Sequence, residues 1–141
     1  MANQAVKVEL YGNNGDGRPR RFTIADATTI KKGDLMKLTD PRTAASAAET
    51  TSLAILAAAG IASMDKEAND GSTSISLWTD GIFELGCSGA VRKGETIGFL
   101  ANNVVTSAQH LPAGSGAAIA GYALEDVAGN AFEVINVRIN L

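Results

Sequence analysis

Several short stretches of the sequence combine residue types that bind ligands in other proteins. Ile30–Leu38 reads IKKGDLMKL, and Val91–Phe99 repeats the pattern as VRKGETIGF. Glycine beside lysines suggests a phosphate cradle, but a P-loop needs G-x-x-x-x-G-K-[ST], which neither stretch contains. In the simpler interpretation, glycine takes a positive φ, the charges stay in solvent and the flanking apolar residues enter the core. We therefore predict a structural turn that is used twice.

Metal sites are not indicated by the sequence. Gly12–Gly17, GNNGDG, has side chains typical of a calcium loop, but it lacks the register D-x-[DN]-x-[DN]-G and the closing glutamate. A loop tip is the better interpretation. Cys87 is the one cysteine and His110 the one histidine, which leaves no His/Cys cluster and no intramolecular disulfide. We expect no metal and no cofactor.

No residues have the spacing of a catalytic set. Gly86–Ala90 reads GCSGA, which departs from the pattern G-x-S-x-G of a nucleophile elbow because the closing glycine directly follows Ser88, and no strand-to-helix context is indicated. The acids between apolar stretches lie in predicted turns, where a solvated charge is the common role. We therefore predict that the protein is not an enzyme. Trp78 and Phe83 flank the tripeptide TDG and are predicted to lie in the core.

Composition and charge limit the partners. A hydrophobic content of 45% argues against disorder, and no apolar stretch approaches the ~20 residues that span a membrane. Eight of the twelve lysines and arginines lie in residues 1–42, but the net charge of -3 and the pI of about 5.1 do not fit a nucleic-acid-binding protein. We expect a soluble protein that binds neither nucleic acid nor membrane.

The chain contains an internal repeat. Ile30–Met36 aligns with Val91–Ile97 at an offset of 61 residues, and the same offset aligns Ala59–Ala62 with Ala120–Ala123. Two separated matches at one offset indicate two related halves. After an N-terminal arm and loop, residues 1–20, we predict a single β domain, residues 21–141, whose halves are about 21–80 and 81–141.

Strands are predicted from alternating apolar and polar residues in three stretches: VKVELYG, TSISLWT and VINVRINL. In the repeat, Ile75 aligns with Ile135 after a gap of one residue. Turn residues separate short strands throughout, which is typical of barrels and sandwiches. The predicted fold class is all-β, with a compact β-barrel or β-tulip-like body.

One segment departs from this pattern. Arg42–Gly60 is rich in alanine, which favours a helix, so a short helix is an alternative. Serines and threonines interrupt the alanines, and the second half has a shorter segment at this place. We therefore predict an extended or loosely ordered loop at 41–52 and a strand at Leu53–Ser63.

The motifs together resemble those of a known family. A hydrophobic-Lys-Gly-acid phrase is followed by AGIAxxD and DGIFEL, then by KGETIGF and the closing AGYALEDVAGNAFEVINVRI. From about Arg21 to the C-terminus, this order is similar to that of the decoration, or capsid cement, proteins of tailed-phage heads. The resemblance implies a β-rich body, in some members of the β-tulip type, that commonly trimerises on the outer face of the capsid.

The implied function is that of a structural head protein. It would bind the major capsid protein lattice from outside the virion as a homotrimer, after synthesis in the host cytoplasm. Such a protein needs no active site and binds by weak contacts that symmetry multiplies. A head-fibre or tail component of the same fold is an alternative that differs only in location.

The resemblance also directs attention to the N-terminal arm. Ala2–Lys7 has backbone groups that would add a strand to a neighbouring sheet, and nearby arginines would pair with an acidic capsid rim. The candidate capsid-binding residues are Ala2, Asn3, Gln4, Val6, Lys7, Arg18, Arg20 and Arg21. A frayed terminus and a solvated loop is the alternative. Deleting residues 2–8 is expected to weaken binding without unfolding the body.

A second class of function also has two similar β halves. Lipoyl and biotinyl carrier domains repeat strands around turns like VKKGD, and they modify a lysine in a hairpin. Here the nearest stretch is Met64–Ala68, MDKEA, in which Lys66 follows an aspartate but precedes Glu67 rather than methionine or alanine. The carrier hypothesis predicts added mass on Lys66, and a small ligand-binding β module is a further alternative of this class.

Overall fold

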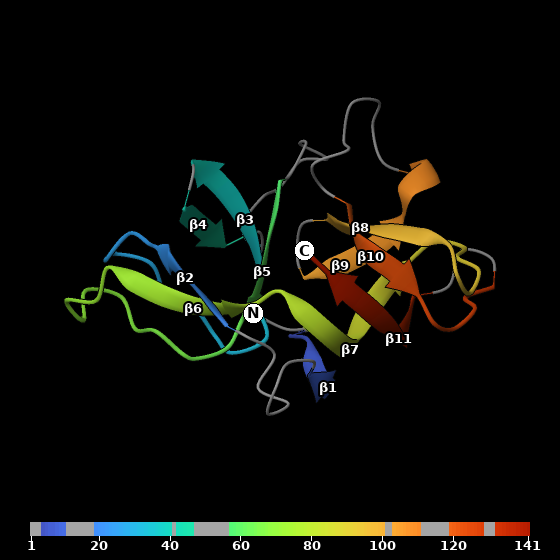
Figure 1. Cartoon of the computed structure of the whole chain (residues 1–141), viewed down its shortest axis with the longest axis horizontal. Coiled ribbons are helices and arrows are strands. Elements are labelled where there is room, and N and C mark those ends of the chain that lie inside the picture. The colour runs from blue at the N-terminus through green and yellow to red at the C-terminus, as the bar shows by residue number, and fades with distance from the viewer. Residues whose placement is uncertain are drawn as a thin grey trace.

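The computed structural model describes residues 4–10, 19–40, 42–46, 57–100, 103–110, 119–128 and 132–141. These residues form two closed five-stranded barrels, which lie side by side along the long axis of the molecule (Figure 1). The predicted all-β class with two related halves is therefore confirmed.

The first barrel has the strand order β2-β4-β3-β5-β6. Its strands are β2 (Arg20–Thr23), β3 (Leu35–Asp40), β4 (Thr43–Ser46), β5 (Ala58–Ala62) and β6 (Ser74–Trp78). The parallel pairing of β2 with β4 closes the barrel, and its other pairings are antiparallel.

The second barrel repeats this connectivity strand for strand. Its strands are β7 (Asp80–Ser88), β8 (Thr96–Leu100), β9 (Val104–Ser107), β10 (Ile119–Ala123) and β11 (Phe132–Asn140), with a 3₁₀ helix η1 (Ala108–His110) after β9. The parallel pairing of β7 with β9 corresponds to that of β2 with β4. An additional strand, β1 (Val6–Leu10), extends this sheet by pairing antiparallel with β7.

Alternation of side chains explains why these segments form strands. In β6, Ile75 and Leu77 are buried, whereas Ser74 and Ser76 face outward. In β11, Ile135, Val137 and Ile139 enter the barrel in the same way. Each barrel thus encloses its own apolar interior.

The two barrels share an apolar junction. Leu35, Ile61 and Trp78 point away from the first barrel's interior and join the buried cluster of the second, together with Ala5. The strands β3 and β5 are therefore buried on both faces, which explains the uninterrupted apolar residues of AGIA. The ring of Trp78 lies 5.7 Å from that of Phe83, centroid to centroid, so the prediction that both are core aromatics is confirmed.

The alanine-rich segment is partly described. Thr43–Ser46 forms β4, so this piece of the predicted loop at 41–52 is a regular strand that closes the first barrel. Within the predicted strand Leu53–Ser63, residues 58–62 form β5. Residues 41 and 47–56 lie outside the described part of the chain.

Candidate functional site

The two Lys-Gly-acid turns have the same geometry. Gly33 has a φ of 93° and Gly94 a φ of 83°, the left-handed conformation that favours glycine. The N–H of Gly33 donates to Ala62 O at 2.8 Å, and that of Gly94 donates to Ala123 O at 2.7 Å. The predicted turn is confirmed in both halves, where it anchors the following strand.

The acids of these turns bind the backbone. Asp34 Oδ2 accepts the N–H of Lys31 at 3.0 Å, and Glu95 Oε2 accepts that of Arg92 at 2.9 Å. Each carboxylate thereby caps its own turn. Lys31 and Lys32 are exposed as predicted, but Asp34 is only 3% exposed. The expectation that all charges of the turn stay in solvent is therefore wrong for Asp34.

Asp34 is buried because it joins the two halves. Its Oδ1 accepts a hydrogen bond from Asn103 Nδ2 at 3.0 Å and one from Gln4 Nε2 at 3.1 Å. Asn103, at the start of β9, also accepts the N–H of Leu35 through Oδ1 at 2.9 Å. One buried polar cluster, Gln4, Asp34 and Asn103, thus links the N-terminal segment, the first barrel and the second.

The N-terminal segment belongs to the fold. Ala5 is buried, and its N–H donates to Gly33 O at 2.7 Å. Val6 and Lys7 pair with Glu84 and Phe83 of β7, and Figure 1 shows β1 beside that strand. The structure argues against the prediction that deleting residues 2–8 spares the body, because the deletion removes the buried Ala5 and three of the five residues of β1.

Lys7 also contacts the junction. Its Nζ lies 5.7 Å from the centroid of the Trp78 ring, and Lys32 Nζ lies 5.6 Å from the same centroid. At these distances an ammonium group is attracted to the face of an indole. The two lysines therefore cover the junction at Trp78 and place positive charge beside β1.

The other predicted binding residues are only partly described. Arg20 and Arg21 lie on β2, where their backbones pair with β6, and their exposed side chains form no hydrogen bond or ion pair with the described residues. Ala2, Asn3 and Arg18 lie outside the described residues, as does the loop Gly12–Gly17. The structure thus brings Gln4, Val6 and Lys7 together on one segment, with Arg20 and Arg21 on another.

Two exposed apolar residues were missed by the sequence analysis. Phe132 is 52% exposed and Val134 is 61% exposed on the outer face of β11, across β7 from Val6. Their counterparts in the first half are Ser72 and Ser74. Because both halves have the same fold, folding alone does not require apolar residues there. Aligning the last strands of the halves residue by residue would have revealed this difference.

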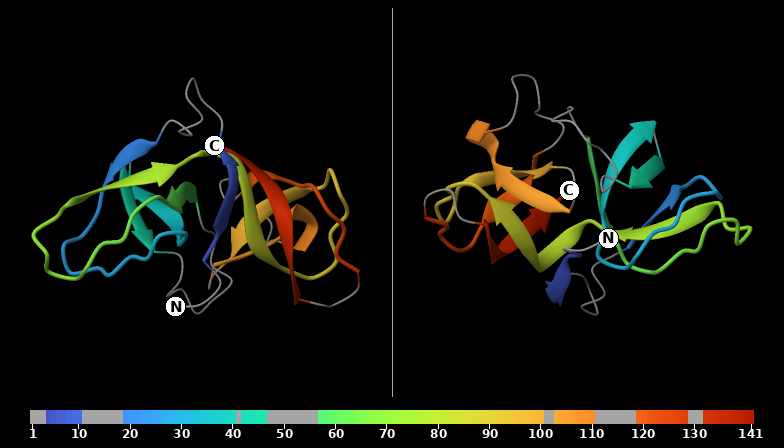
Figure 2. Two further views of the ribbon diagram at one scale, coloured as in Figure 1. Left: turned by 90° about the horizontal axis from the view of Figure 1, so that it is seen from below. Right: turned by 180° about the vertical axis from the view of Figure 1, so that it is seen from behind.

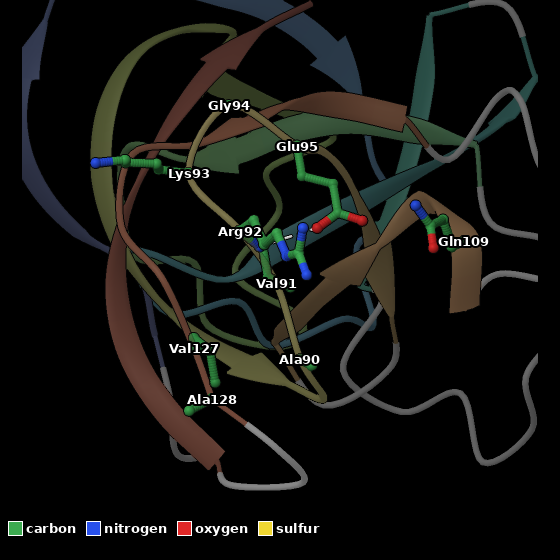
Figure 3. A pocket seen from close by; sticks show the side chains of 9 residues that line it. All are labelled: Ala90, Val91, Arg92, Lys93, Gly94, Glu95, Gln109, Val127 and Ala128. Atoms are coloured by element: carbon green, nitrogen blue, oxygen red, sulfur yellow. Dashed lines mark hydrogen bonds between the residues drawn. The ribbon is translucent and has the colours of Figure 1, made fainter.

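A hollow of about 780 Å³ lies beside the second turn (Figure 3). Lys93 points away from the other labelled charged side chains in this view. Glu95 is already bonded to the N–H of Arg92 and accepts the hydroxyl of Ser107 at 2.6 Å. This arrangement supports a structural role for the turn.

Lys66 is buried rather than available for modification. Its side chain is 3% exposed, and Nζ forms an ion pair of 3.2 Å with Asp70. Nζ also donates to the carbonyl oxygens of Asp26, Thr28 and Glu67. A carrier domain presents its lysine to a modifying enzyme, so the carrier hypothesis is wrong for Lys66.

The described residues contain no group of three His, Cys, Asp or Glu side chains placed to hold a metal ion. Within the same part of the chain, no helix has the length and hydropathy to cross a membrane.

We predict that Cys87 is unreactive in the folded protein. Burial, together with the negative charges of Glu133 and Glu95, raises the pKa of its thiol to about 11. A thiol reagent at pH 8 is expected to label the protein in denaturant but not in native buffer. Because the pKa is raised from 9.0 to about 11, the folded state favours the protonated thiol. The stability that the buried, protonated thiol contributes is therefore fully present below pH 9.0 and is lost as the pH rises towards 11. Rapid labelling of the native protein would contradict the prediction.

A comparison with family models matches the chain to one family, described as phage cement protein, over residues 15–139. This range includes nine of the ten barrel strands in full and β11 except for its last residue, Asn140. A search of curated proteins gives no significant match.

Proposed function

Because the chain belongs to the family of phage cement proteins, we propose that it is a decoration protein, which binds the outer surface of the major capsid protein lattice and stabilises the head as a homotrimer. The family match over both barrels is the observation that carries the proposal. The protein is a structural component of the phage capsid. In this proposal it is made in the host cytoplasm, has a β-tulip-like body and has no enzymatic activity.

The proposed capsid contact begins at β1. This strand is the last in the order β1-β7-β11-β10-β8-β9, and its outer edge pairs with no strand of the described residues. An open edge with exposed Val6 and Lys7 offers backbone donors and acceptors to an extended segment of a partner. The capsid strand thus adds to β1, which remains in its own sheet.

The adjoining outer face supplies apolar contact area. Val6, Phe132 and Val134 are all more than half exposed, and β7 lies between the strands that carry them. Burial of such side chains is the main source of affinity in most protein interfaces. The exposed side chains of Arg20 and Arg21, which bond to no described group, are available to acidic groups of the capsid or of a neighbouring copy.

We predict that Val134→Ser and Val6→Ser each weaken capsid binding by at least ~10-fold without lowering the unfolding midpoint. Both side chains are exposed, and serine stands at the position of Val134 in the first half. Met64→Ser, which removes an apolar side chain that is 49% exposed in another turn, is the matched control. Unchanged affinity of both variants would exclude this face as the contact.

Co-sedimentation tests the proposed function. Purified protein is titrated onto expanded capsids that lack it, and the bound amount is compared with binding to isolated tails. We expect saturation at a fixed ratio on capsids and a higher temperature of capsid disruption. Binding to tails but not to capsids would identify a tail component and overturn the proposal.

A further inference from the structure

The contact between the two halves is directional. The first half contributes Leu35, Ile61 and Trp78, which leave their own barrel and join the other apolar cluster. The second half receives them at the end of its barrel, where Asn103 binds Leu35 and the ring of Phe83 packs on Trp78. One face of the first barrel is therefore seated on the end of the second.

The second barrel carries the same outward face, and this face is uncovered. By the repeat, the counterparts of Leu35 and Ile61 are Thr96 and Tyr122. Thr96 is exposed, and Tyr122 is 43% exposed. Tyr122 lies on β10 between Thr96 of β8 and Arg138 of β11. A large aromatic residue thus remains in solvent where its counterpart in the first half is buried.

The first barrel carries the corresponding receiving end. Arg42 is the counterpart of Asn103, and both have a positive φ, 69° and 60° respectively. Arg42 borders a hollow of about 690 Å³, whose wall also includes Leu38 and Ala59, the counterparts of Phe99 and Ala120. The end of the first barrel is thus hollowed at the place where the second barrel receives its partner.

At the places of Asn103 and Asp34, the counterpart residues carry opposite charges. In the internal contact, neutral Asn103 donates to Asp34. The counterparts are Arg42 and Glu95, a cation and an acid. Leu77 and Val137 are counterparts in the last strands of the two barrels. Arg20 pairs with Leu77 and Phe83 pairs with Val137, so Arg20 stands at the place of Phe83 in the first barrel. Arg138 stands at the place of Trp78, so two arginines replace the aromatic pair there, and the charge of Arg138 is neutralised by its ion pair with Asp80.

We propose that copies of this chain bind head to tail, with the Thr96 and Tyr122 face of one copy seated on the Arg42 end of the next, in the geometry of the internal contact. The proposal deepens the homotrimer part of the proposed function and rests on it. A head-to-tail contact is heterologous and forms a closed ring when its rotation permits. Opposite charges at Arg42 and Glu95 set the register of the contact.

Cross-linking between engineered cysteines tests the contact directly. In the internal contact, Asn103 reaches the backbone of Leu35 at 2.9 Å, so their counterparts Arg42 and Thr96 meet between copies. The double variant Arg42→Cys/Thr96→Cys is expected to form covalent dimers and a closed ring under mild oxidation. Each single variant is expected to form no more cross-linked dimer than the wild type, whose Cys87 is buried. A double variant that stays monomeric on non-reducing electrophoresis overturns the proposal.

Light scattering provides the second measurement. Tyr122→Ser and Arg42→Glu are expected to weaken self-association by at least ~10-fold, whereas Met64→Ser and Lys93→Glu, also at exposed residues, leave it unchanged. Equal association of all four variants overturns the proposal. A wild-type monomer that still saturates capsids also overturns it and leaves the capsid-binding function intact. Failure of an assembled ring to bind capsids would instead contradict the proposed function alone.

Discussion

Replacing Asp34 with alanine is expected to lower the free energy of unfolding by about 3 kcal/mol. The change removes the carboxylate that accepts hydrogen bonds from the backbone of Lys31 and from the side chains of Gln4 and Asn103. Asn103 is fully buried, so its amide group cannot turn to water for compensation. Gln4 and Asn103 thereby lose a shared acceptor at the contact between the two halves.

Denaturant titration followed by tryptophan fluorescence measures this effect, since Trp78 lies at the same junction. Asp126→Ala is the matched control, because this exposed acid accepts one backbone hydrogen bond, from Lys93 at 2.7 Å. It is expected to cost about 1 kcal/mol or less. In a double-mutant cycle, Asp34→Ala and Asn103→Ala should be coupled by about 1 kcal/mol or more. Additive effects would show that Asp34 stabilises only its own turn.

Replacing Lys66 with methionine is expected to lower the free energy of unfolding by about 2–3 kcal/mol. Methionine fits the space of the aliphatic stem but leaves three carbonyl acceptors and Asp70 without the ammonium group. The bonds of the ammonium group hold the segment after β5 against the segment after β2. Lys66 and Ile30 also exchange two backbone hydrogen bonds between the same segments. The first half is therefore expected to lose stability.

Lys93→Met is the control for Lys66→Met, because Lys93 is an exposed lysine in a turn of the second half. A measurable pH effect is expected as well. The backbone N–H of Ser72, together with Lys66, holds the pKa of Asp70 below 3.8. The stability that the ionised Asp70 carboxylate contributes is therefore present at neutral pH and is lost as the pH falls below 3.8. An equal loss of stability in both lysine variants would contradict the structural role of Lys66.

The repeat could be predicted from sequence because both halves preserve the turn and the strand after it. The bridge between Ile30 and Lys66 recurs as a bridge between Val91 and Val127, at the same offset of 61 residues. Positive φ at Gly33 and Gly94 follows from the same local pattern. Local patterns are sufficient here because the turn is closed by residues within each half.

The differences between the halves could not be predicted in this way. Asp34 and Glu95 occupy equivalent turns, but Asp34 meets Asn103 of the other half, 69 positions away in the chain, whereas Glu95 accepts a hydrogen bond from Ser107 of its own half. Lys66 stands where the second half has Val127, and nothing near it in sequence indicates burial. Contacts between distant segments decide these environments, and no local spacing reports them.

For the N-terminal segment, the sequence predicted the secondary structure correctly but not its place in the fold. Alternation in VKVELYG correctly indicated a strand, which is β1. The interpretation of Ala2–Lys7 as an arm overlooked that an edge strand is held by its own sheet, since β7 provides the pairing. Val6 and Lys7 remain proposed capsid contacts, now as part of an ordered edge.

The most direct test of the account is a cryo-electron microscopy map of capsids that lack this protein, after saturation with the purified chain. We expect added density on the outer surface at symmetry-related positions, in the shape of two barrels for each copy, with β1 and the face of Val6, Phe132 and Val134 against the shell. Saturated capsids without added density, or with density that contacts the shell only through other faces, would contradict the account.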